Sequence, residues 1–206
     1  RIAIPSSVGT VFMTLYNVVD TYFAGKISAE ALAALAQTFP VYFIIIAMGV
    51  GLSIGTTSLI ANALGEKKEK VASYFLAQSI ILAIFVFIIV AIAGIYLGPY
   101  IIITMNKSLI TLSLSMEYLN IIFLGSFFIF IQMTVNSSLS AMGDTKSNRN
   151  VLIFSFFLNI ILNPLFIFGY GIIPAMGIKG IALSTIVSQM IGTIYIIYKA
   201  SKTQLR

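Results

Sequence analysis

Residues 71–97, VASYFLAQSIILAIFVFIIVAIAGIYL, decide the fold class, because this stretch contains no charged side chain. A helix of about 20 mostly apolar residues crosses the roughly 30 Å hydrocarbon core of a bilayer. A helix also satisfies its backbone N–H and C=O groups within itself, which the bilayer core requires. The stretch therefore predicts a transmembrane α-helix.

The rest of the chain has the same character. Only 9% of its 206 residues are charged, whereas soluble domains carry about 25%. Five further apolar stretches pass the same length test. The sequence therefore predicts an all-α polytopic membrane protein with six transmembrane helices, at approximately 2–24, 31–64, 71–97, 112–142, 151–168 and 178–198. Pro40 gives the second helix a place to bend.

Several classes of function are excluded by residues that are missing. The chain contains no Cys and no His, so it has no disulfide, no thiolate nucleophile and no imidazole metal ligand. Its net charge of +6 comes from basic residues scattered between apolar stretches, which does not indicate nucleic acid binding. The sequence also lacks a phosphate-binding glycine loop and a nucleophile with a nearby base. We therefore expect neither an enzyme nor a bound cofactor.

The basic residues predict the orientation in the membrane, because cytoplasmic loops carry an excess of Lys and Arg. With the N-terminus inside, nine of the 12 basic residues are cytoplasmic, namely Arg1, Lys67, Lys68, Lys70, Lys146, Arg149, Lys199, Lys202 and Arg206. Lys26, Lys107 and Lys179 lie outside. We expect both ends to be cytoplasmic, in the plasma (inner) membrane of a prokaryote. Because the chain opens on Arg1 and enters an apolar stretch at once, we also expect it to be a piece of a longer protein.

Asp20 is an acid within a predicted span, where a charged side chain is energetically unfavourable. A charged side chain at the bilayer centre costs on the order of 2.5–3.5 kcal/mol on insertion scales, so a buried acid in a span suggests function. Asp20 lies about 27 Å along the first helix at 1.5 Å per residue. Tyr16 and Asn17, four and three residues earlier, place further polar groups beside it. An ordinary cap at the outer end of the helix is the alternative.

Polar residues of two other helices fall at nearly the same depth as Asp20. Asn159 and Asn163 are one turn apart on one face of the fifth helix, and Thr185 lies about 10 Å into the sixth. One carboxylate, two amides and a hydroxyl suit Na⁺, which prefers oxygen ligands, or a proton held on the acid. The same amides and hydroxyl could equally tie helices together.

Other polar and small residues give weaker indications. Gln132 and Asn136 share a face of the fourth helix and either line a cavity or pack. Gly51 and Gly55 form a GxxxG motif, which predicts close helix packing.

Two of the predicted inner loops look alike. Gly65 and Gly143 each end a helix, where glycine suits the left-handed conformation. In each loop the next residue is an acid, Glu66 or Asp144, which can cap the following helix.

Five stretches, in this order, resemble the N-terminal six-helix half of a multidrug and toxic compound extrusion (MATE) transporter. The resemblance runs through essentially the whole chain. The stretches are NVVDTYFAGKISAEALAALA at 17–36, GLSIGTTSLIANALGEKKEKV at 51–71, SAMGDTK at 140–146, LNIILNPLFIFG at 158–169 and MGIKGIALSTIVSQ at 176–189.

The resemblance implies one lobe of a two-lobe (6+6) transporter, with substrate in a cleft that opens alternately to the two sides. Residues 1–206 then form a single six-helix lobe. The second lobe is absent from this chain and would come from the same parent chain or from a second copy. The implied activity is multidrug efflux by a secondary antiporter that exports amphiphilic, often cationic, drugs or toxic metabolites in exchange for Na⁺ or H⁺.

The resemblance also implies a coupling-cation site in this lobe, with its acid at Asp20, its amide at Asn159 and its hydroxyl at Thr185. At Asn163, family members with the best-formed site carry a second Asp, so this chain has one negative charge fewer. A site with Asp20 alone becomes neutral on binding one Na⁺ or one H⁺. Related sequences also place a proline in the first helix, as at Pro5, where a bend could link the charge of Asp20 to the cleft. The alternative is that Pro5 simply occupies the first turn of a helix, a position that proline favours.

Two other classes of function remain as alternatives. A related flippase for lipid-linked oligosaccharides would need a cationic cleft, and the predicted spans contain no clear interior Lys or Arg. A channel or a non-transporting membrane scaffold would not depend on Asp20 for coupled export.

Overall fold

The computed structural model describes residues 3–105 and 108–203, without the side chains of residues 3–7 and 10. Over these ranges the chain forms six α-helices, α1 (Ala3–Ile27), α2 (Ala29–Gly65), α3 (Glu69–Met105), α4 (Leu109–Ala141), α5 (Lys146–Phe168) and α6 (Ile178–Ala200). Helices α2 to α6 are each long and apolar enough to cross a membrane. Helix α1 has 25 residues, two more than α5 or α6, and carries several polar ones. The predicted all-α membrane fold is confirmed.

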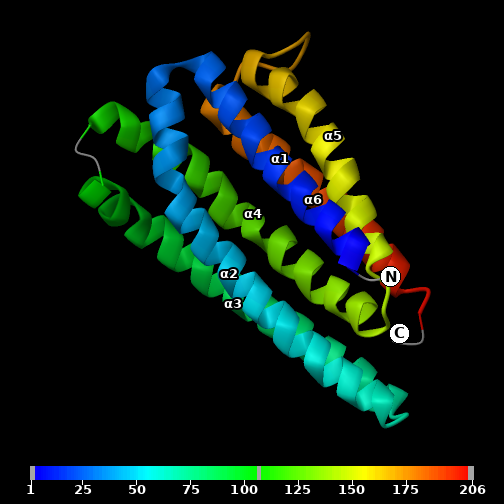
Figure 1. Cartoon of the computed structure of the whole chain (residues 1–206). Helices are drawn as coiled ribbons and strands as arrows, with labels where there is room; N and C mark the ends of the chain where they lie inside the picture. The colour runs from blue at the N-terminus through cyan, green and yellow to red at the C-terminus, as the bar shows by residue number, and fades with distance from the viewer. Residues whose placement is uncertain (1–2, 106–107, 204–206) are drawn as a thin grey trace.

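The helices form two groups that meet along α4 and α6. Helices α2, α3 and α4 lie together on one side of the lobe, and α1, α5 and α6 lie together on the other (Figure 1). Helix α4 packs against α2, α3 and α6, and it supplies many of the largest fully buried side chains, including Leu119, Ile122, Phe123, Phe130 and Leu139. The lobe is therefore built around α4.

The two ends of the lobe differ in charge. The α2–α3 and α4–α5 connections lie at the same end as both termini (Figure 1). This end, which we name the basic end, carries Lys67, Lys68, Lys70, Lys146, Arg149, Lys199 and Lys202. At the opposite end the Lys179 Nζ lies 3.6 Å from Glu117 Oε1. The positive-inside rule still predicts that the basic end faces the cytoplasm.

Prolines do not end the long helices. Helix α2 continues through Pro40 and changes direction in its N-terminal part (Figure 1). Helix α3 runs through Pro99 to Met105, eight residues beyond the predicted end of the span at 97. A proline removes only one N–H donor from the helix. The residues after Pro99 are mostly apolar and include the buried Ile102, so they favour continuation of the helix.

The two inner loops differ in geometry, although their sequences predict the same one. Gly65 has no left-handed backbone and is simply the last residue of α2. Lys67 adopts the positive φ of 60° instead, so the prediction for Gly65 is wrong. Glu66 pairs with Lys68 at 2.7 Å.

The α4–α5 loop follows the prediction. Gly143 has a φ of 82°, and Asp144 Oδ1 accepts hydrogen bonds from the backbone N–H groups of Lys146 (3.1 Å) and Ser147 (3.0 Å). Partial burial raises the pKa of Asp144, but the hydrogen bonds from Ser147 and Lys146 outweigh it and hold this pKa below its ordinary value. Asp144 therefore fixes the start of α5, five residues before the predicted start of the span at 151.

The GxxxG prediction is wrong within this lobe. A Cβ placed on Gly51 or Gly55 would meet no atom within 4 Å, so neither glycine packs against another described helix. A glycine does allow two helix backbones to approach closely at Gly180 of α6, where an added Cβ would come within 2.6 Å of the Phe166 carbonyl carbon. A short motif gives the shape of one helix surface but not the identity of its neighbour.

Candidate functional site

Helix α1 has two faces of different character. Tyr16, Asp20 and Ala24 recur every four residues, which places them on one face of the helix, and all three are buried. Asp20 is only 5% exposed. None of the ion pairs found among the described residues involves Asp20. An acid is therefore buried in the lobe without a basic partner.

Three neutral donors from two other helices surround the Asp20 carboxylate. Its Oδ1 accepts hydrogen bonds from Asn159 Nδ2 (3.0 Å) and Asn163 Nδ2 (2.8 Å), both on α5. Its Oδ2 accepts a hydrogen bond from Thr185 Oγ1 of α6 at 3.2 Å. The four residues predicted to share one depth are thus brought into direct contact, and all of them are buried.

Ser184 belongs to the same network, although sequence reasoning did not single it out. Its hydroxyl donates to Asn163 Oδ1, while Asn163 Nδ2 also donates to Asn159 Oδ1 at 3.0 Å. Ser184 precedes Thr185 directly, so the two hydroxyls project from neighbouring positions of α6. Depth along the helix could have indicated Ser184, but several other hydroxyls of α6 compete with it on that criterion.

The chemistry of this cluster favours a single positive charge. It offers the two carboxylate oxygens of Asp20, two amide oxygens and two hydroxyls, the oxygen ligands that hard cations prefer. Within residues 3–105 and 108–203 no group of three or more acids could hold a metal ion. A divalent cation would want more carboxylate, whereas one Na⁺ or one proton neutralises Asp20.

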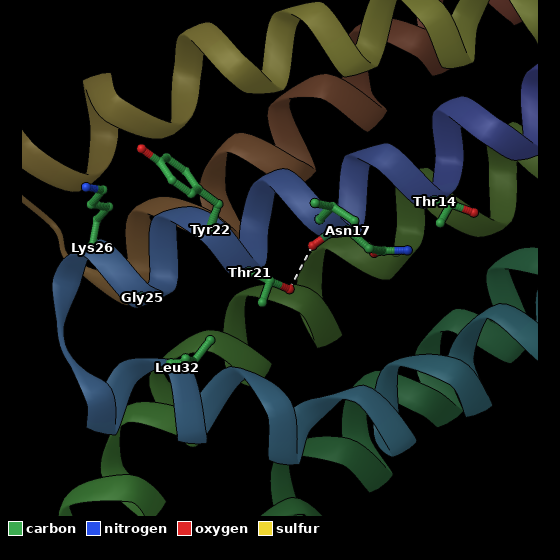
Figure 2. A pocket seen from close by; sticks show the side chains of 8 residues that line it. Thr14, Asn17, Thr21, Tyr22, Gly25, Lys26 and Leu32 are labelled. Carbon is green, nitrogen blue, oxygen red and sulfur yellow. Dashed lines mark hydrogen bonds between the residues drawn. The ribbon is translucent and has the colours of Figure 1, made fainter.

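The other face of α1 borders an open groove of about 680 Å³. Figure 2 shows Thr14, Asn17 and Thr21 along this face, with Leu32 of α2 near Gly25. The Thr21 hydroxyl donates to the Asn17 carbonyl at 2.8 Å, and Asn17 Nδ2 donates to the Met13 carbonyl at 3.3 Å. Asn17 makes none of the hydrogen bonds to Asp20, because it projects from the groove side of α1.

A second, smaller hollow lies inside the lobe. This inner cavity has a volume of about 260 Å³, and its lining includes Tyr16, Asn17, Gln132 and Asn136. The sequence left open whether Gln132 and Asn136 pack or line a cavity, and the structure places both in the wall. Pro5 lies in the first turn of α1, but its side chain is outside the described residues.

Comparison with known proteins identifies the family. A family model described as MatE matches residues 5–165. The chain is 31% identical over its full length to a probable multidrug resistance protein, NorM, of Thermotoga maritima and covers 45% of that protein. It is 28% identical to the FAD transporter of Shewanella oneidensis, with 93% of this chain and 42% of that protein aligned.

Solved structures agree with the sequence comparison. A crystal structure of a MATE transporter in the bent conformation matches 99% of this chain and 45% of its own, with a TM-score of 0.90 and 28% identity. An outward-facing MATE transporter of the MOP superfamily matches 96% of this chain and 43% of its own, with a TM-score of 0.87 and 29% identity. The chain thus spans less than half the length of these relatives. It belongs to the MATE family of transporters, of which it forms one six-helix lobe.

Proposed function

We propose that this lobe is the cation-coupling half of a secondary active antiporter that exports amphiphilic molecules in exchange for Na⁺ or H⁺. The observation that carries the proposal is Asp20, an acid buried without a basic partner and held by neutral donors from α5 and α6. Such a group gains most from a bound proton or monovalent cation, because binding removes a charge that the membrane interior disfavours.

Helix α1 connects the two activities that such a transporter needs. Asp20 lies on its buried face and the groove lies along the opposite face. A cation or proton on Asp20 weakens the carboxylate's hydrogen bonds to α5 and α6, because a neutralised carboxyl accepts more weakly. The preferred position of α1 then changes, and with it the shape of the groove. Pro5, in the first turn of α1, is the candidate position for a bend.

The groove indicates the class of substrate. Its lining combines apolar side chains with neutral polar ones, and at its far end Lys26 Nζ lies 5.4 Å from the centre of the Tyr22 ring. This surface suits amphiphilic drugs or toxic metabolites, in keeping with one relative named a probable multidrug resistance protein and another named a multidrug export protein. Lys26 adds a positive charge to this end of the groove, so an anionic amphiphile is a second candidate substrate. One relative is named an FAD transporter.

We further propose that the groove becomes a closed cleft only with a second lobe, from the same parent chain or from a second copy. The relatives are more than twice as long as this chain. The lipid bilayer is the other expected partner. The relatives from Shewanella oneidensis and Thermotoga maritima favour a prokaryotic plasma membrane. The charge difference between the two ends favours an orientation with the basic end in the cytoplasm.

Drug efflux by the full-length parent in everted vesicles tests the proposal. We expect an imposed Na⁺ gradient or an imposed pH gradient to drive efflux, and the effective gradient identifies the ion. Asp20→Asn should abolish this coupling. Asp144→Asn is the matched control, because Asp144 is an acid that caps α5 outside the membrane spans. Gradient-driven efflux that survives Asp20→Asn would overturn the proposal.

A further inference from the structure

A second groove lies between helices that take no part in the groove along α1. Helices α3 and α6 both pack against α4 but not extensively against each other, so they leave an open space of about 420 Å³ over α4. We name this space the α3–α6 groove, and its lining consists of Leu76, Ile80, Ile131, Val135, Ile197, Ala200 and Ser201. Because the two grooves share no helix, a second lobe can close the groove along α1 without covering the α3–α6 groove.

The α3–α6 groove lies in the half of the membrane next to the basic end. Ser201 is the C-cap of α6, and Ile131 is ten residues, or about 15 Å, from the last residue of α4 at Ala141. This length is about half of the roughly 30 Å hydrocarbon core. Apart from Ser201 the lining is apolar, and Ile197 is 45% exposed. The groove is therefore placed and lined to receive the acyl chain of a lipid.

The apolar lining does not select one lipid over another. Lipid tails are as apolar as the Leu and Ile side chains of the wall, so a tail gains no hydrophobic free energy when it leaves the bilayer for the groove. All phospholipids have similar tails and differ mainly in their headgroups. The choice of lipid therefore depends on the charges where the groove meets the membrane surface.

At that surface the groove ends beside an ammonium group that has no acidic partner. Lys202 directly follows Ser201, and its Nζ donates a hydrogen bond to the Tyr198 hydroxyl and lies 4.2 Å from the centre of that ring. None of the ion pairs found among the described residues involves Lys202. Tyr and Lys side chains characteristically lie at the level of the lipid headgroups. Lys202 is thus available to a phosphate at that level.

The wider surroundings of Lys202 also favour an anionic headgroup. The basic end carries seven Lys and Arg side chains among the described residues and three acids, Glu66, Glu69 and Asp144. Glu66 is already paired with Lys68 at 2.7 Å. Basic sites between transmembrane helices on the cytoplasmic side bind anionic headgroups, because each Lys or Arg near the surface adds to the attraction.

We propose that the α3–α6 groove binds an anionic phospholipid, with one acyl chain between α3 and α6 and the phosphate beside Lys202. The bound chain fills the space that the two helices leave over α4 and so connects them. This site uses none of the residues around Asp20. The lipid site and the proposed antiport can therefore be tested, and can fail, separately.

Quenching of tryptophan fluorescence by brominated lipids tests the proposal. The lobe contains no Trp, so Ile197→Trp places one reporter in the wall of the groove once any Trp elsewhere in the full-length parent is replaced by Phe. Phe85→Trp is the matched control, because Phe85 lies on α3, is 59% exposed and lines neither groove. Each variant is reconstituted in phosphatidylcholine bilayers, and brominated phosphatidylglycerol or brominated phosphatidylcholine is added as the quencher.

We expect phosphatidylglycerol to bind beside Ile197→Trp about tenfold more tightly than phosphatidylcholine, and the two lipids to quench Phe85→Trp equally. An equal preference at the two positions overturns the proposal. Failure of both lipids to quench Ile197→Trp also overturns it, because protein then covers the groove. If Ile197→Trp does not fold, Ile80→Trp reports from the facing wall with the same outcomes.

A change of charge tests the role assigned to Lys202. Lys202→Gln in the Ile197→Trp background should reduce the preference for phosphatidylglycerol about fivefold, the effect of one basic residue near an anionic surface. Lys202→Arg should retain the preference. Lys179→Gln, at the opposite end of the lobe, is the control and should leave it unchanged. A preference that survives Lys202→Gln in full overturns the placement of the phosphate beside Lys202.

Discussion

The position of Asn163 allows a strong test of the cation site, because it lies where a second acid would act directly on Asp20. Asn163 Nδ2 is 2.8 Å from Asp20 Oδ1. In Asn163→Asp a second carboxylate oxygen replaces this nitrogen, and two unit charges at that distance repel by about 6 kcal/mol at an effective dielectric constant of about 20. The variant therefore needs a cation or a proton between the two acids.

This repulsion sets the scale of the expected gain in cation binding. The full 6 kcal/mol corresponds to about four orders of magnitude in affinity, which is an upper bound because the side chains can move apart. Even a hundredfold gain adds about 2.7 kcal/mol of stability at saturating Na⁺. The natural chain, with Asp20 as its one acid in the cluster, should show a smaller effect of Na⁺.

Thermal unfolding of the purified full-length parent measures the effect, in alkaline buffer containing either Na⁺ or choline. We expect Na⁺ to stabilise Asn163→Asp by several degrees more than it stabilises the natural protein. The difference should shrink in acidic buffer, where a proton occupies the site instead. Asn163→Leu is the control, because it removes the same hydrogen bonds without adding charge. If Na⁺ stabilises Asn163→Asp no more than the natural protein, the reasoning about this site is refuted.

Three further predictions concern the frame that holds the site. Gly180→Ala should destabilise the parent by roughly 1–3 kcal/mol, because its Cβ would press on the backbone of α5, whereas Gly51→Ala, which meets nothing in this lobe, should not; thermal unfolding compares the two. Ser28→Ala should cost about 1 kcal/mol, since Ser28 Oγ accepts from Ala31 N–H at 3.0 Å as the N-cap of α2, and Ser28→Asp should restore the loss in the same assay. The cap made by Asp144 should stabilise α5 fully above pH 3.8, its ordinary pKa, and lose this contribution as the pH falls through the lower folded-state pKa. Unfolding scans of Asp144→Ala against the natural protein should therefore differ at neutral pH and converge in acid.

Depth along a helix was enough to select the three residues that donate hydrogen bonds to Asp20, namely Asn159, Asn163 and Thr185. Helices that cross one membrane all run roughly along the membrane normal. Polar residues at equal depth on three neighbouring helices can therefore meet. Depth does not fix the rotation of each helix, however. This is why Ser184 could not be separated from the other hydroxyls of α6, and why Asn17, close to Asp20 in sequence, projects from the groove side of α1.

Short motifs were less reliable than depth, because their meaning depends on a neighbour that the motif does not specify. The Gly51 and Gly55 pair has the spacing for close packing and meets no described helix. The Gly65 loop and the Gly143 loop read alike, yet the left-handed residue of the first is Lys67. In the second loop, Asp144 caps α5 through the 3.0 Å hydrogen bond from the Ser147 backbone, and this fixes where the helix begins.

The free-energy cost of a charge in the membrane bears on whether the Asp20 cluster has a structural or a coupling role. If the cluster served only to join α1 to α5 and α6, a neutral side chain would do so without the cost of about 2.5–3.5 kcal/mol that a charge incurs in the membrane. Asn at position 20 could still accept from Asn159 and Asn163 through its amide oxygen.

A purely structural role therefore predicts that Asp20→Asn leaves stability equal or higher and leaves transport intact. A coupling role predicts equal or higher stability together with the loss of gradient-driven efflux. Measuring unfolding and efflux on the same preparation separates these two roles from simple misfolding, which would lower both. The combination of a stable protein and absent coupling is expected only if the charge of Asp20 itself is used.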